Sequence, residues 1–170
     1  MIIKARQTIF FTAFFFISCA TPNLNLKNMN QQNDETAGIQ PPNDTIPKVI
    51  GIGGIFFFSE NPKAANDWYR NNLGIEASDY GASFESRNID NPQEINTLQW
   101  SLFKKGSTYF APSKKEFMIN YRVQNIEGLV NKLKENGVTI IDSIATYDYG
   151  KFIHILDSEG NKIELWEPIY

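Results

Sequence analysis

The chain has one cysteine, one histidine and no excess of positive charge, and these shortages exclude whole classes of protein. Cys19 is the only cysteine among 170 residues, so no disulfide can form within the chain. Lysine and arginine number 16 against 19 aspartate and glutamate residues, which gives a net charge of −3 at pH 7. Attraction to nucleic-acid phosphates would need the opposite sign of charge and a basic run. We therefore expect no nucleic-acid partner.

The amino terminus has a short apolar stretch over residues 9–17, preceded by Lys4 and Arg6 and followed by Ser18. A basic start, a short apolar core and small residues after it are typical of an export signal. A membrane-spanning helix would need roughly 20 apolar residues, which makes a retained anchor helix the weaker alternative. We predict a signal peptide over residues 1–18.

The position of Cys19, directly after Ile17-Ser18, resembles the lipobox of bacterial lipoproteins, in which the signal is cut before the cysteine and the thiol carries a lipid. Phe16 stands where a leucine is usual. Lipidation would give the unpaired thiol of an exported chain a purpose. The resemblance implies a protein of the bacterial cell envelope, held outside the cytoplasm on a membrane by a lipid on Cys19. The alternative is an ordinary cleaved signal with an incidental cysteine.

Residues 19–47 are rich in Asn, Gln, Thr and Pro and contain few large apolar side chains. Such a segment cannot bury enough surface to fold. We predict a lipid-anchored flexible tether that spans on the order of 30 Å. Residues 48–170 are then one domain of ordinary size, with Trp68, Trp100 and Trp166 available for its core.

Within this domain the order strand, helix, strands occurs twice. The first half is predicted as a strand over 49–58, a helix from Asn61-Pro62 to Gly74, and strands near 83–87 and 98–103. The second half is predicted as a strand over 117–123, a helix from Asn125 to a cap at Gly137, and strands near 138–144, 151–156 and 162–166. The predicted apolar stripes of the helices are Ala65, Trp68 and Tyr69, and Leu129, Val130 and Leu133.

The segment 157–161 reads as a tight turn between the last two strands. If Leu156 pairs with Lys162, His154 lies opposite Glu164 with both side chains on one face. His154 is the only histidine in the chain. The alternative is a loop-closing turn with an exposed carboxylate. The closing strands of the two halves also correspond, which sets Gln99 in the place of Glu164.

The duplicated unit strongly resembles the vicinal oxygen chelate superfamily of glyoxalases, extradiol dioxygenases and bleomycin-resistance proteins. The resemblance is carried by residues 68–74 and 157–165, and by the glyoxalase-like motifs at 51–54 and 147–150. It implies an α+β fold in which two tandem βαβββ modules join mixed sheets that curl into a cup. Ligands of such proteins bind inside the cup.

In metal-using members the ligands come from the first and last strands of each module, and the resemblance places Gly54, Met118, Gln99 and Glu164 at these positions. Glycine offers no donor, and a thioether is a poor partner for hard divalent ions. We therefore expect no metal and no other cofactor. The alternative is a divalent metal held by His154, Glu164 and Gln99 in a lyase or dioxygenase.

Strand alternation predicts which other side chains face the cup. It turns Met118, Asn120 and Arg122 inward and Ile119 and Val123 toward the helix. We expect catalytic roles for His154, Glu164 and Arg122. We expect ligand-binding roles for Gln99, Asn120, Trp166, Phe56 and Phe58. The structural alternatives are that Arg122 and Glu164 neutralise one another and that His154 is a satisfied, half-buried histidine.

Three function classes remain, because a fold alone does not choose among them. We favour an exported domain, monomeric or homodimeric, that binds a small organic molecule in its cup, with or without metal-independent lyase or isomerase chemistry. In such chemistry Glu164 or His154 would move a proton next to a carbonyl while Arg122 holds the negative charge. The second class is the metal-dependent lyase or dioxygenase. The third is an envelope protein-docking module, against which the polar runs 63–67 and 132–136 argue.

Overall fold

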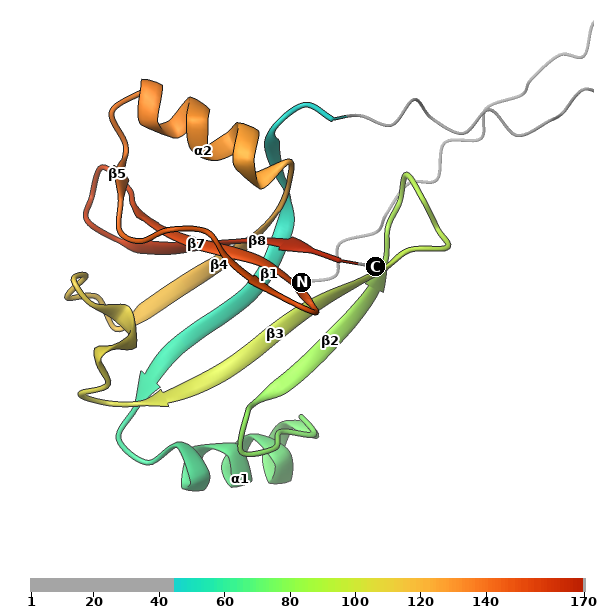
Figure 1. Cartoon of the computed structure of the whole chain (residues 1–170). Coiled ribbons are helices and arrows are strands. Elements are labelled where there is room, and N and C mark those ends of the chain that lie inside the picture. The colour runs from blue at the N-terminus through green and yellow to red at the C-terminus, as the bar shows by residue number, and fades with distance from the viewer. Residues whose placement is uncertain (1–44, 170) are drawn as a thin grey trace, which may run out of the picture. The chain divides into compact units, whose positions relative to one another are not determined.

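The computed structural model describes residues 45–169 (Figure 1). The predicted signal peptide (1–18), Cys19 and most of the predicted tether (19–47) lie outside the described residues. The strands are β1 (Lys48–Ser59), β2 (Ala82–Arg87), β3 (Ile95–Lys104), β4 (Phe117–Gln124), β5 (Thr139–Ile140), β6 (Ala145–Tyr147), β7 (Gly150–Leu156) and β8 (Lys162–Pro168). The helices are α1 (Pro62–Leu73), α2 (Ile126–Glu135) and the short 3₁₀ helix η1 (Thr108–Phe110).

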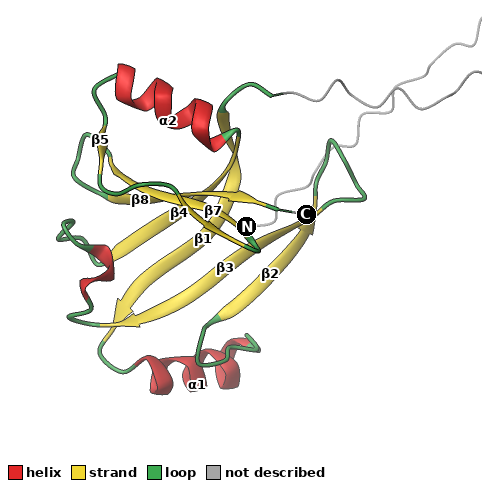
Figure 2. Ribbon diagram, viewed as in Figure 1, coloured by secondary structure: helices red, strands yellow, loops and turns green. Residues whose placement is uncertain are grey.

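The strands form one mixed, curled sheet in the order β2-β3-β1-β4-β8-β7-β5, with β6 paired to β7 (Figure 2). At its centre β1 and β4 run antiparallel, while β1 pairs in parallel with β3 and β4 pairs in parallel with β8. Each half of the sheet is therefore the counterpart of the other across the β1–β4 pair. The predicted α+β class and glyoxalase-like architecture are confirmed.

The halves differ in their strands after the helix. In the first half only β2 and β3 follow α1, and an isolated bridge between Ser78 and Gly81 precedes them. In the second half the strand predicted near 138–144 is present only as the two-residue strand β5, and a second short strand, β6, begins just after this range at Ala145. The break has a local cause, because Asp142 accepts the backbone N–H of His154 with its side-chain Oδ1 at 2.8 Å. At this point the N–H of His154 bonds to the Asp142 side chain instead of to a backbone carbonyl of a neighbouring strand.

Both helices begin and end close to their predicted caps. The side chain of Asn61 accepts the N–H of Ala64, and α1 ends at Gly74 in the left-handed conformation, with φ of 68°. The side chain of Asn125 accepts the N–H of Gly128 at the start of α2. The second C-cap is Asn136, one residue before the predicted Gly137.

The helices pack very differently on the sheet. Helix α2 buries Ile126, Leu129 and Val130 in the main core, which it shares with side chains of β4, β7 and β8. Helix α1 buries only Asn66, and Trp68 is 54% exposed. The predicted apolar stripe of α1 is therefore wrong for Trp68. Polar bonds fix this helix instead, because the Asn66 amide donates to the Ser78 carbonyl at 2.9 Å.

The inner face of the sheet carries one row of residues that pair from strand to strand. From β2 to β7 the row reads Ser83, Gln99, Gly54, Asn120, Glu164 and His154. A second hydrophobic cluster, to which η1 contributes Phe110, is formed by Phe56, Phe58, Phe103, Phe110 and Met118. Neither α1 nor α2, among the described residues, is long and apolar enough to cross a membrane.

Candidate functional site

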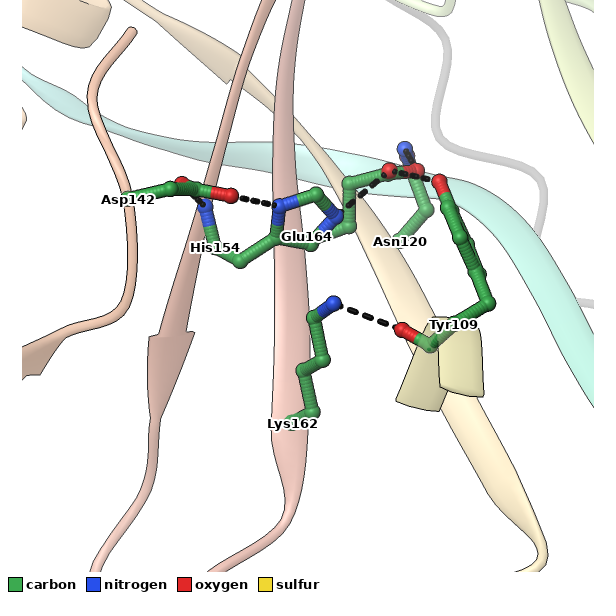
Figure 3. A network of polar contacts seen from close by, with 6 residues as sticks. All are labelled: Tyr109, Asn120, Asp142, His154, Lys162 and Glu164. Atoms are coloured by element: carbon green, nitrogen blue, oxygen red, sulfur yellow. Dashed lines mark hydrogen bonds and ion pairs between the residues drawn. The ribbon is translucent and has the colours of Figure 1, made fainter. Parts of the chain in front are cut away.

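The turn 157–161 sets two titratable side chains next to one another on the inner face. The Asp157 carboxylate accepts the backbone N–H of Glu159 and of Asn161 at 2.9 and 2.8 Å, which closes the turn. Leu156 then pairs with Lys162, and His154 pairs with Glu164. The predicted register is confirmed. Figure 3 shows the polar network that results.

Glu164 lies at the centre of this network and is only 5% exposed. Its Oε2 accepts the Tyr109 hydroxyl at 2.7 Å and faces His154 Nε2 at 2.9 Å, while Oε1 accepts the Asn120 amide at 2.7 Å. Burial by itself would raise the pKa of this carboxyl, but the bonds from His154, Asn120 and Tyr109 outweigh it and hold the pKa below its usual value. Glu164 is therefore ionised over the whole neutral range.

His154 joins Glu164 to a second carboxylate near the surface. Its Nδ1 faces Asp142 Oδ2 at 2.6 Å, while its Nε2 faces Glu164. Burial opposes a charged ring, yet the hydrogen bonds to Glu164 and Asp142 raise the pKa of His154 above its ordinary value. Because both nitrogens face carboxylate oxygens, the doubly protonated imidazolium fits this position best. The side chain of Asp142 is 44% exposed, so the chain Asp142, His154, Glu164 leads from solvent to the interior.

Tyr109 reaches Glu164 from η1, in the connection between β3 and β4. Its ring stacks on Phe103 at 4.9 Å between centroids. Lys162 fixes its backbone, because the ammonium donates to the Tyr109 carbonyl at 2.6 Å and lies 5.0 Å from the ring centre. Burial lowers the pKa of Lys162, and burial together with the Glu164 charge raises the pKa of the Tyr109 hydroxyl. The tyrosine is thus a neutral donor.

Next to this network lies a cavity of about 310 Å³. Polar and aromatic side chains together form its lining: Tyr109, Asp142, Ser143, Ala145, Tyr147, Tyr149, Phe152, His154 and Glu164. The rings of Tyr147 and Tyr149 stack at 5.4 Å, and Phe152 contacts both edge to face. A concave site with aromatic walls and a few convergent polar groups is typical of small-molecule binding.

The remaining predicted site residues lie outside the lining of this cavity. Arg122 is 5% exposed and extends across Gly51, where an added Cβ would come within 2.6 Å of its Nη2, to donate to the Thr97 carbonyl at 3.3 Å. Within residues 45–169 the structure has no ion pair between Arg122 and Glu164, so these two side chains do not neutralise one another. Gln99 bonds to its strand neighbour Ser83 at 2.8 Å, on the first half of the sheet.

The three predicted aromatic ligand-binding residues pack against other aromatic side chains. Phe56 packs in the buried cluster with Phe110 and Met118, and Phe58 stacks on Phe110 at 4.3 Å between ring centroids. The indole of Trp166 stacks on Phe152 at 6.0 Å. Asn120, in contrast, touches the network directly through Glu164.

Sequence reasoning missed several residues of the site, some on strands and some in the connections between them. Phe152 could have been found, since it lies two residues before His154 and alternation puts both on one face. Tyr147 and Tyr149 belong to a motif that carried the family resemblance but was assigned no role. No periodicity points to Tyr109, which lies in η1, or to Asp142, at the break between β5 and β6.

The donor set does not fit a divalent metal of the kind used by some members of the family. Gln99 and Glu164 occupy corresponding positions in the two halves. Gln99 pairs with Gly54 on β1, and Glu164 pairs with Asn120 on β4. The counterpart of Gly54 is therefore Asn120 and not Met118. The predicted ligand position at Met118 is therefore wrong. Gly54 has no donor, the Asn120 amide N–H faces the only carboxylate of the four positions, and both nitrogens of His154 face carboxylates. The described residues contain no cluster of three His, Cys, Asp or Glu side chains able to hold a metal ion.

Comparison with known proteins agrees with this architecture. The model of the glyoxalase/bleomycin resistance protein/dioxygenase superfamily matches residues 51–165. A methylmalonyl-CoA epimerase variant from Streptomyces coelicolor, in complex with 2-nitronate-propionyl-CoA, is similar with a TM-score of 0.54 and 14% identity, over 72% of this chain and 100% of that one. Methylmalonyl-CoA epimerase from Mycobacterium tuberculosis has a TM-score of 0.50 and 18% identity, over 72% and 90%. No curated protein matches the sequence. At such identities the structures show a shared fold, and the family match shows that this chain belongs to the glyoxalase/bleomycin resistance protein/dioxygenase superfamily.

Proposed function

We propose that the domain binds a small organic molecule in the cavity beside Glu164. One observation carries the proposal. A buried, ionised carboxylate held by Tyr109, Asn120 and His154 forms part of the wall of an aromatic cavity. Building such a network costs desolvation energy that an apolar wall would avoid. Polar groups that converge on a cavity orient a ligand, whereas a docking surface has no use for them.

A second candidate is proton exchange with the bound molecule, and the chain Asp142, His154, Glu164 favours it. Its outer carboxylate is partly exposed and its inner one is buried, so a proton can pass from solvent to the cavity along hydrogen-bonded groups. Arg122 lies outside the cavity lining, and the Tyr109 hydroxyl and both nitrogens of His154 already face carboxylates. The lining residues left to donate to a developing negative charge are therefore Ser143, Tyr147 and Tyr149, through their hydroxyls. This is the chemistry of a lyase or isomerase that needs no metal.

Two measurements decide between the candidates. We expect native mass spectrometry of the purified full chain to find a bound organic molecule that is lost in Glu164→Gln and kept in the control Glu85→Gln. An unchanged ligand in Glu164→Gln would overturn the proposed site. Uptake of deuterium from D₂O by the identified molecule, lost in the same variant, would add catalysis to binding.

We propose that this function needs no stoichiometric divalent ion. The support is the donor set, in which Gly54 offers no ligand and His154 offers no free nitrogen. Elemental analysis of the purified full chain tests the proposal. One zinc, manganese, nickel or iron per chain, removable by chelator and lost in Glu164→Ala, would overturn it and favour the metal-dependent alternative.

We also propose that the domain acts outside the cytoplasm, on a lipid anchor at Cys19. The support is the sequence alone, with Lys4, Arg6 and the apolar stretch before a solitary cysteine. In a bacterial host, Cys19→Ser should move the protein from the membrane fraction to the soluble envelope fraction. An unmodified Cys19 in the mature protein, or cleavage at another residue, would contradict the anchor.

A further inference from the structure

We propose that the cavity selects an organic cation, such as an amine or a quaternary ammonium group. This inference rests on the proposed function, since it names the class of molecule that the same cavity would bind. It follows from three features of the lining: its charge, its aromatic faces and the absence from it of any lysine or arginine.

The lining is acidic. Asp142 and Glu164 contribute two carboxylates, and His154 is the only group among the lining residues able to carry a positive charge. The cavity wall therefore keeps one negative charge even when the imidazole is protonated. The ammonium of Lys162 does not line the cavity and is turned toward the Tyr109 carbonyl.

Asp142 is the carboxylate that an entering ligand meets first. Glu164 is buried and already has three hydrogen-bond partners, whereas the Asp142 side chain is 44% exposed beside the cavity. Its bonds to His154 come from one ring nitrogen and one backbone N–H, so much of its oxygen surface still faces solvent. A cation placed there replaces weakly bound water with an opposite charge.

Aromatic rings line the same cavity as Asp142. Tyr147 and Tyr149 are 51% and 57% exposed, and their rings stack with an interplanar angle of 7°. Phe152 braces both rings with centroid distances of 5.9 and 5.6 Å. The face of an aromatic ring attracts a cation within about 6 Å, most strongly when water is displaced.

Anionic ligands fit this wall poorly. The solved epimerase similar in fold was crystallised with an acyl-CoA analogue, a molecule that carries several phosphates. In this chain the phosphates of such a ligand would meet Asp142 with no lining arginine or lysine to offset it. Arg122 is buried and lies across Gly51, outside the cavity lining.

The test compares three small molecules of nearly the same shape: choline, its uncharged isostere 3,3-dimethyl-1-butanol, and the anion 3,3-dimethylbutanoate. Each is titrated into the purified full chain at neutral pH, with the His154 ring signals as the readout. We expect choline to bind about tenfold more tightly than the alcohol, and the carboxylate more weakly than both. Asp142→Asn and Tyr149→Leu should each weaken choline by a factor of about five to ten, while the distant control Asp90→Asn leaves it unchanged.

Equal affinities for choline and the alcohol, tighter binding of the anion, or no binding of choline at all would overturn the inference. So would unchanged choline affinity in both Asp142→Asn and Tyr149→Leu. Each of these outcomes leaves the proposed function intact if Glu164→Gln still abolishes capture of the bound molecule in native mass spectrometry. Loss of that dependence on Glu164 is the separate result that would remove the site itself.

Discussion

The two halves of the sheet place different chemistry on equivalent backbone positions. In the second half His154 pairs with Glu164, and Glu164 pairs with Asn120. At the same places in the first half Ser83 pairs with Gln99, and Gln99 pairs with Gly54. Ser83 and Gln99 are joined by a neutral hydrogen bond of 2.8 Å. His154 and Glu164 are joined by a contact of 2.9 Å between two titratable groups. One fold thus carries an ionisable site and, beside it, an uncharged copy.

The packing follows the same division. Helix α2 buries three apolar side chains in the main core, whereas α1 is attached mainly through Asn66, Arg70 and the contact of Tyr69 with Trp100. The half with the titratable network is also the half with the tighter core. This association makes sense physically, because a charged pair is held in a fixed geometry only by rigid surroundings.

The largest expected difference between the halves lies in their helices. Ile126→Ala removes a fully buried side chain from the core and should lower the free energy of unfolding by about 3 to 4 kcal/mol. Leu73→Ala, at a residue 60% exposed on α1, should cost less than about 1 kcal/mol. Urea unfolding of both variants measures the difference. Equal losses would mean that α1 is packed as firmly as α2.

The next effect concerns the central carboxylate. Glu164→Ala leaves the donors of Tyr109, Asn120 and His154 without their acceptor, and should cost about 3 kcal/mol. The matched change in the first half, Gln99→Ala, should cost about 1 kcal/mol, since Gln99 makes only neutral bonds. Thermal or urea unfolding at pH 6 tests the pair, and a larger loss in Gln99→Ala would contradict it.

The third effect is on protonation. In the folded protein the pKa of His154 is raised and that of Glu164 is lowered. The contribution of His154 to folding stability is fully present below the imidazole pKa of the unfolded chain and is lost as pH rises through the pKa in the folded protein. The contribution of Glu164 is fully present above the carboxyl pKa of the unfolded chain and is lost as pH falls through the pKa in the folded protein. The pair therefore stabilises most between about pH 4.3 and about pH 6.5.

The measurement is an NMR titration of the single histidine in Glu164→Gln. We expect the pKa of His154 to fall in this variant, because the carboxylate that favours its charged form is gone. The stability difference between wild type and this variant should shrink toward alkaline pH. Gln99→Glu, the reciprocal change, should leave the pKa of His154 nearly unchanged. An unaltered titration in Glu164→Gln would contradict the coupling.

The smallest expected effect is at Ser83. Ser83→Ala removes one bond to Gln99 at an exposed position and should cost about 0.5 kcal/mol. The matched His154→Ala should cost roughly 1 to 3 kcal/mol, because it leaves a buried carboxylate short of a donor. Urea unfolding near pH 6 resolves the two variants. Comparable losses would show that the neutral copy is as tightly coupled as the charged one.

The elements and the register of the site could be predicted because they depend on local signals. Asparagine caps mark both helices, and the turn at 157–161 fixes the pairing of His154 with Glu164. The prediction that Met118 corresponds to Gly54 was wrong because the segment between this position and the following helix differs in length between the two halves. Helix α1 begins eight residues after Gly54, and α2 begins six residues after Asn120. A position carried from the first half to the second by counting residues therefore misses by two.

The parts of the site that could not be predicted come from side-chain contacts across long sequence separations. Tyr109 meets Glu164 from 55 residues away, and Asp142 leaves a strand to bind His154 from 12 residues away. Arg122 and Phe56 were placed on the correct face by alternation, but alternation does not say which neighbours cover a residue. Here Gly51 gives Arg122 room to lie across β1, and Phe110 from η1 covers Phe56.

The attachment of residues 45–47 has a mechanical consequence. The carbonyls of Thr45 and Ile46 accept the side-chain amides of Asn125 and Gln124, so the chain is clamped to the start of α2 before it enters β1. β1 is a central strand, paired with both β3 and β4. A force applied to the chain ahead of Thr45 would act along β1, parallel to the strand. The hydrogen bonds of β1 to β3 and β4 would then have to break together, and not one after another from an edge. A domain held from this side would resist extension while its cavity stays in shape.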